Sequence, residues 1–207
     1  MNLIVLRGIG IAAILGVAAI GIYYFGPQII PQKMSDPLQQ ALDQIQTGLT
    51  YDKFVNMTNS QRDALVQKMP QQTIALIMDD AKKFSTTVSE SMQDMISKVS
   101  PTSHSIVFSK QGEFVGLDHE AKGKAEIISV GNISFLRFEN FEVTNGPDLH
   151  VYMTINGDIT TGIDLGKLKG NIGDQNYELK RVDTNTYDTV VIYSQPFHVY
   201  FAKAKLS

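Results

Sequence analysis

The chain of 207 residues contains four histidines and no cysteine, and this limits the chemistry that it can carry. The histidines are His104, His119, His150 and His198. A zinc or copper site needs about three converging ligands, and no local pattern such as His-x-His or His-Glu-x-x-His is present. Only the fold could gather the histidines, so the sequence predicts no metal site and no bound cofactor.

Several aspartates and one serine are weaker candidates for chemistry. Asp148, Asp158 and Asp164 could line a calcium-bearing loop at one end of a β-sandwich, or they could stabilise turns by hydrogen bonds. Residues 183–188 mimic the start of an EF-hand loop, but the glycine at the sixth position and the glutamate at the twelfth are missing, which excludes that motif. Ser194 has no histidine or aspartate at a recognisable catalytic spacing. The sequence therefore predicts no catalytic residue.

The elements that must position these side chains are β-strands. From Ser105 onward apolar and polar residues alternate, and turn signals separate the alternating segments. Asn156-Gly157 is typical of a tight hairpin. The predicted strands include residues 106–108, 124–129, 133–138, 149–155, 177–179, 189–193 and 199–201. Short strands at this spacing predict an antiparallel β-sandwich or barrel.

Strict alternation also assigns side chains to faces. It places Phe138, Asn140 and Glu142 on one face of a strand, and their neighbours on the other. Four tyrosines on or beside the strands could form a binding face or an electron-hopping path, or they could pack at a sheet surface. These are Tyr152, Tyr177, Tyr193 and Tyr200.

Short motifs in the C-terminal half occur in the order found in one known domain family. They are Gly112-Glu113-Phe114, His119, Gly123-Lys124-Ala125, residues 145–149 (Asn-Gly-Pro-Asp-Leu), residues 164–170 (Asp-Leu-Gly-Lys-Leu-Lys-Gly) and residues 201–206 (Phe-Ala-Lys-Ala-Lys-Leu). Over about residues 103–207 the chain resembles the DM13 domain. The resemblance implies an electron-transfer or redox role, often beside cytochrome-type domains, with a reactive cysteine in the penultimate strand.

This chain departs from that family pattern at Ser194, which stands where the thiol would be. A serine hydroxyl has no accessible one-electron or thiol–disulfide chemistry. His119 matches a family position and is the best single candidate for a functional polar residue. With Asp148, Asp164 and Ser194 it makes up the set of candidate functional residues.

Residues 35–100 are predicted to form a helical region. Ser35-Asp36-Pro37 is typical of a helix start. Asn59-Ser60 should begin a second helix, and the apolar pattern predicts a third over residues 70–99. Such helices could form a small subdomain, or they could pair with another copy of the chain or with a protein partner. Residues 100–103 read as the linker to the sandwich.

Residues 1–26 are predicted to be a transmembrane signal-anchor. The uncharged apolar run at 8–25 would span about 27 Å as a helix, close to the hydrocarbon core of a bilayer. Arg7 precedes it, and the next positive charge is Lys33. The positive-inside rule therefore puts the sandwich outside the cytoplasm. A cleaved signal peptide, or pilin-like processing after Arg7, would account for the same pattern.

Charge and composition narrow the function classes. The formal net charge is -3 and the pI is about 5.8, which argues against a nucleic-acid partner. No motif supports a hydrolase. The sequence favours a cell-membrane protein with one N-terminal helix and an extracytoplasmic DM13-like domain that acts as a non-catalytic binding or assembly module. The alternative is a redox module that works with a metal or a cytochrome-like partner.

Overall fold

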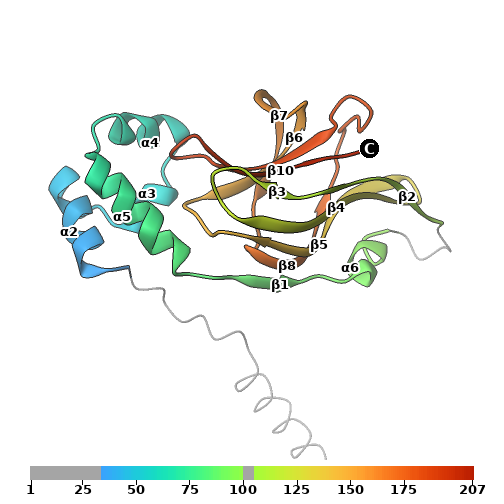
Figure 1. The fold of residues 1–207 in the computed structure, drawn as a ribbon, viewed down its shortest axis with the longest axis horizontal. Coiled ribbons are helices and arrows are strands. Elements are labelled where there is room, and N and C mark those ends of the chain that lie inside the picture. The colour runs from blue at the N-terminus through green and yellow to red at the C-terminus, as the bar shows by residue number, and fades with distance from the viewer. Residues whose placement is uncertain (1–33, 100–104) are drawn as a thin grey trace, which may run out of the picture. The chain divides into compact units, whose positions relative to one another are not determined.

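Two five-stranded β-sheets form the C-terminal half of the protein (Figure 1). The computed structural model describes residues 34–99 and 105–207. The predicted membrane segment at 8–25, the linker at 100–103 and His104 lie outside the described residues. Sheet A has the order β1 (Thr87–Ser89), β8 (Ile172–Glu178), β5 (Ile133–Val143), β4 (Ala121–Val130) and β2 (Ile106–Glu113), and sheet B the order β3 (Val115–Gly116), β10 (Val199–Lys205), β9 (Thr189–Ser194), β6 (Leu149–Ile155) and β7 (Asp158–Lys167).

The core lies between the sheets, where alternate residues of the strands meet. All pairings are antiparallel except that of β1 with β8. The core includes the fully buried Val151, Ile192 and Phe201. The predicted Asn156-Gly157 hairpin is confirmed, since both residues have positive φ (54° and 86°) and join β6 to β7.

Strict alternation fails along β5. The prediction that Phe138 and Phe141 face opposite sides is wrong, because both side chains lie in the core. Asn140 has a φ of 49° and the register shifts between Phe138 and Glu142, so the strand turns over locally. The backbone N–H of Asn140 donates to Asp174 Oδ1 at 2.9 Å, which holds this irregular point in place.

No strand was predicted over residues 158–167, where the structure has β7. The strand contains Gly162 and Gly166 and lies at the edge of sheet B, so its alternation is weak.

Short helices precede the sandwich; α2 to α5 gather at one end of it, and α6 lies toward the other end (Figure 1). They are α2 (Asp36–Ile45), α3 (Tyr51–Val55), α4 (Asn59–Val66), α5 (Gln71–Lys82) and α6 (Met92–Ile96). Ser35 caps α2, as predicted. The cap of α4 is Thr58, one residue before the predicted start, because Thr58 and Gln61 form a reciprocal capping box. Within the described ranges no helix is long and apolar enough to cross a membrane.

The prediction of one helix over residues 70–99 is wrong. The helix ends at Lys82, and the chain continues as β1, which pairs in parallel with β8. Thr86 N–H donates to Asn171 Oδ1 at 2.7 Å. Gly173 permits the close approach, since a Cβ there would lie 2.0 Å from the carbonyl oxygen of Val88. The open edge of sheet A therefore takes up a segment whose local pattern favours a helix.

The helical region and the sandwich share packed contacts. Leu38, Leu42, Phe54 and Ile77 form the centre of the helical core. Phe197, from the turn between β9 and β10, packs on Phe54 with ring centroids 5.8 Å apart. Residues Met34–Ser207 form one compact unit.

Candidate functional site

A buried charge cluster centred on Asp148 joins α4 to sheet B. Asp148 lies in the turn before β6 with a φ of 46°, and its side chain is 2% exposed. The carboxylate pairs with Arg62 of α4 and with Lys167 Nζ at 2.8 Å. His150 Nε2 lies 3.6 Å from Asp148 Oδ1, an ion-pair distance that is too long for a hydrogen bond. Three cationic groups therefore surround one buried carboxylate.

His150 links Asp148 to Asp164. Its Nδ1 lies 2.9 Å from Asp164 Oδ2, a bond that crosses from β6 to β7. Gln195 closes the cluster from the turn after β9, because its Nε2 donates to Asp164 Oδ2 at 3.0 Å and to Tyr152 Oη at 2.7 Å. Gln195 Oε1 accepts from Arg62 at 3.0 Å. The cluster thus ties two strands, one turn and one helix together.

The charges in this cluster stabilise one another. Burial alone would raise the pKa of Asp148, but the positively charged side chains of His150, Lys167 and Arg62 beside it hold the pKa far below its ordinary value. Burial alone would lower the pKa of His150, but the carboxylates of Asp148 and Asp164 raise it to about 9. His150 is therefore an imidazolium at neutral pH, and both carboxylates beside it are ionised.

Ser194 is closed off from solvent. Its side chain is fully buried, and Oγ donates to the carbonyl oxygen of Pro147 at 2.7 Å. This bond fixes the turn that carries Asp148. The hydroxyl therefore acts as a structural donor, because it has no room to meet a reactant.

Three tyrosines form a continuous aromatic chain on sheet B. Tyr193 packs edge-on against Tyr152 with centroids 6.0 Å apart and against Tyr200 with centroids 5.1 Å apart. Tyr193 Oη lies 3.0 Å from His198 Nδ1. The fourth predicted member, Tyr177, lies in the core instead, and its Oη donates to Gln175 Oε1 at 2.7 Å.

His119 lies apart from the charge cluster, in the loop between β3 and β4. Its ring stacks on Phe201 with centroids 3.8 Å apart. Burial, and then the charge of Lys82, lower the pKa of His119, so the imidazole is neutral at neutral pH. The loop is tight, since a Cβ on Gly116 would lie 1.9 Å from the carbonyl oxygen of His119.

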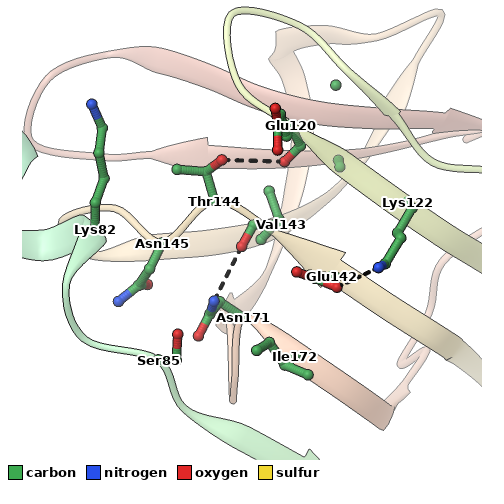
Figure 2. Close-up of a pocket in the computed structure, with 12 residues that line it drawn as sticks. Lys82, Ser85, Glu120, Lys122, Glu142, Val143, Thr144, Asn145, Asn171 and Ile172 are labelled. Atoms are coloured by element: carbon green, nitrogen blue, oxygen red, sulfur yellow. Dashed lines mark hydrogen bonds and ion pairs between the residues drawn. The ribbon is translucent and has the colours of Figure 1, made fainter.

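An open cavity of about 550 Å³ lies beside the His119 loop (Figure 2). It lies where the segment after α5 meets the sandwich. Figure 2 shows Lys82, Ser85 and Asn145 along one side of it, and Lys122 and Glu142 along the other. The remaining lining residues are Gly116, Glu120, Ala121, Val143, Thr144, Asn171 and Ile172.

Two asparagines build the wall of this cavity. Asn145 Nδ2 donates to the carbonyl oxygen of Ala81 at 3.0 Å and to that of Phe84, at the C-terminal end of α5. Asn171 Nδ2 donates to the carbonyl oxygen of Val143 at 3.1 Å. Both side-chain amides already donate to backbone carbonyl oxygens. A ligand in the cavity would therefore be bound mainly by the charged residues at its rim.

That rim carries charges of both signs. Lys122 Nζ pairs with Glu142 at 2.6 Å, and Lys82 Nζ pairs with Asp79 at 3.2 Å. Within the described part of the chain the carboxylate of Glu120 has no hydrogen-bond or ion-pair partner. The cavity can therefore offer an anionic and a cationic group to a ligand.

The predicted candidates separate into two places. Asp148 and Asp164 come together through His150, and Ser194 lies behind the turn that carries Asp148. His119 lies in the loop beside the cavity. Asp158 is elsewhere and bonds to Thr160 next to the β6–β7 hairpin. In residues 34–99 and 105–207 no group of three or more His, Asp or Glu side chains is arranged to hold a metal ion.

Sequence reasoning missed Arg62 and Gln195 and gave His150 no role in a cluster. The alternation in β6 already placed His150 and Tyr152 on one face, and that signal was available. No local sequence pattern indicates that β6 pairs with β7 or that α4 packs beside them, so the contacts of Arg62 and Gln195 could not be predicted.

The fold and the site define a β-sandwich domain that is fastened to a helical region by buried polar contacts. Residues 113–206 match the family model described as "Electron transfer DM13", and the chain therefore contains a DM13 domain. This DM13 domain contains no cysteine. No curated protein and no solved structure gave a match.

Proposed function

We propose that the protein is a membrane-anchored extracytoplasmic protein whose DM13 domain binds a partner or a ligand without catalysing a reaction. This proposal rests mainly on the burial and the hydrogen bond of the Ser194 side chain. By the family resemblance it stands where a reactive thiol would be, and its buried hydroxyl donates to the carbonyl oxygen of Pro147. A hydroxyl at this position cannot exchange with a disulfide. The motif residues Asn145 and Asp148 fasten the helical region to the sandwich.

The 550 Å³ cavity is the feature that best suits binding. Its volume lies in the range of small-molecule sites, and it lies at the boundary between two parts of the fold, where such sites are frequent. The free carboxylate of Glu120 and the exposed ammonium of Lys82 suit a ligand or a chain segment with polar groups of both charges.

Site-specific photo-crosslinking in intact cells tests the binding role. A photoreactive side chain at Glu120 should give one defined adduct, whereas the same group at the exposed Lys203, which does not line the cavity, should give none. The mass of the adduct shows whether the crosslinked partner is a second copy of the chain, paired through the helical region, or a different molecule. Equal labelling from both positions, or no adduct from Glu120, contradicts binding at the cavity.

The membrane anchor is supported by the apolar run at residues 8–25 and by the positive charge at Arg7. The full chain should remain with the membrane fraction after an alkaline wash, and a chain that lacks residues 2–26 should not. A compartment-sensitive reporter fused after Ser207 should be active only outside the cytoplasm. The N-terminal sequence of the mature protein distinguishes an intact anchor from a cleaved signal peptide or a pilin-like product.

Electron transfer is the second candidate function. Both the family description and the chain of Tyr152, Tyr193 and Tyr200 favour it. A metal or a cytochrome-like partner would supply the redox centre in this case. Elemental analysis and absorption spectra of the gently purified protein test it, and bound copper or a haem-type spectrum would support it over the binding role.

A further inference from the structure

The hydrogen bond of Tyr193 distinguishes it from the other tyrosines on sheet B. The Tyr193 side chain is nearly buried, and its residue is 8% exposed. Its Oη lies 3.0 Å from Nδ1 of His198, whose Nε2 lies 3.5 Å from Asp63 Oδ1 of α4. A phenol, an imidazole and a carboxylate therefore stand in series across the contact between the sandwich and the helical region.

This series matters because a buried phenol cannot lose an electron alone. The oxidised phenol is a strong acid, and it yields a neutral radical only if a base takes its proton. Imidazole is such a base, and Asp63 can stabilise the imidazolium that forms. The side chain of His198 is 64% exposed, so the proton can pass on to solvent.

The other tyrosines of the predicted set lack an equivalent base. Tyr177 donates to the neutral amide of Gln175, and Tyr200 Oη accepts from the backbone N–H of Ile159 at 3.4 Å. Tyr152 Oη accepts from Gln195 Nε2 and lies near the carboxylate of Asp164. Asp164 is a poor base, because its carboxylate is already paired with the imidazolium of His150. Tyr193 is therefore the member of the aromatic chain with a free route for its proton.

We propose that Tyr193 is a one-electron redox group, with His198 as its proton acceptor. The inference rests on the electron-transfer candidate and not on the binding role. A strong one-electron oxidant, such as a high-valent (ferryl) haem iron of a partner, accepts one electron from the ring. The O–H bond of Tyr193 breaks, the proton moves to His198 Nδ1, and a neutral phenoxyl radical remains. One electron and the same proton restore the phenol.

The neighbouring rings provide the route for the electron. Tyr200 is half-buried on β10 and touches Tyr193 edge-on at 5.1 Å, and Tyr152 lies at 6.0 Å on the other side. Rings in contact exchange an electron readily. Tyr193 thus lies between two partly exposed rings, those of Tyr152 and Tyr200.

The full chain, purified in mild detergent, provides the test. Tris(bipyridine)ruthenium(III), generated by a light flash with a sacrificial acceptor, serves as the oxidant, and freeze-quench EPR detects the tyrosyl radical. We expect the radical signal at early times to disappear in Tyr193→Phe and to persist in Tyr177→Phe. Equal signals in these two variants would overturn the proposal.

A second variant tests the role of His198 without strain. His198 has a φ of 54°, which glycine adopts readily, so His198→Gly should keep the turn. We expect radical formation to slow by about 100-fold, as on loss of a positioned base, and to recover when imidazole is added. An unchanged rate, or a slow rate that imidazole does not restore, would refute the assignment. Failure of the Tyr193 proposal would not by itself exclude electron transfer through a bound metal, which the elemental analysis of the purified protein tests. It would also not affect binding at the cavity, which the photo-crosslinking tests.

Discussion

The free energy of unfolding should fall as the pH rises above 7, because the folded state requires the charged imidazolium of His150. The carboxylates of Asp148 and Asp164 raise the pKa of His150 from 6.5 to about 9. Below pH 6.5 both the folded and the unfolded chain bind this proton, so the stabilisation is fully present. Between pH 6.5 and 9 only the folded chain keeps it, and above 9 the stabilisation is lost.

The magnitude follows from the difference between the two pKa values. Each tenfold change in proton affinity corresponds to about 1.4 kcal/mol, so the full contribution is about 3 kcal/mol. Part of it is already lost at pH 7, and about 2 kcal/mol should disappear between pH 7 and 9.5. The side chain of His150 is 11% exposed, so solvent screening reduces this figure only slightly.

Urea unfolding of residues 34–207, followed by circular dichroism, measures this contribution. This fragment is suitable because it forms one compact unit. The unfolding free energy should decline from pH 6.5 to 9.5 in the wild type and stay nearly flat in His150→Gln. His119→Gln is the matched control and should keep the decline, because the pKa of His119 is lowered and its proton is lost below this range.

Parallel pH profiles for the wild type and His150→Gln would refute this reasoning. They would mean that His150 is neutral in the folded protein, and that Arg62 and Lys167 alone balance the two carboxylates.

Three further predictions concern the same fold. Arg62→Ala should lower the unfolding free energy by about 3 kcal/mol in urea titrations, because it removes one partner of the buried Asp148, and Arg62→Lys should lose less; equal losses would show that the charge plays no part. Gly116→Ala should lower the melting temperature, since its Cβ would collide with the carbonyl oxygen of His119; an unchanged value would contradict the tight loop. A thiol introduced by Ser194→Cys should react with a disulfide reagent only when the fold opens, and fast labelling of the folded protein would show that the position is accessible.

Local sequence patterns correctly predicted those elements in which all residues favour the same secondary structure. The alternation after Ser105 predicted the strands, Asn156-Gly157 predicted the hairpin, and Ser35 predicted the start of α2. The order of short motifs predicted the DM13 domain, which the family comparison confirms. These features depend on interactions between residues close together in the sequence, so local sequence patterns are sufficient to predict them.

The predictions failed where a distant segment decides the local conformation. Residues 87–89 have a helical pattern in their surroundings, yet they pair with β8, because an open sheet edge offers them hydrogen bonds. Asn140 breaks the alternation of β5 at a bond to Asp174 from another strand. In both cases long-range pairing outweighs a weak local preference.

The amino-acid composition and the local motifs limit which chemistry this protein can perform. It has no thiol, and it has the aspartates, histidines and tyrosines from which any site must be built. How these side chains combine depends on the folded arrangement of the strands and helices. The pairing of β6 with β7 and β9 brings His150 to Asp164 and Tyr152 to Tyr193, and the docking of α4 adds Arg62 and Asp63. Charge pairing and proton acceptance depend on distances of about 3 Å, and such distances between segments far apart in the chain exist only after folding.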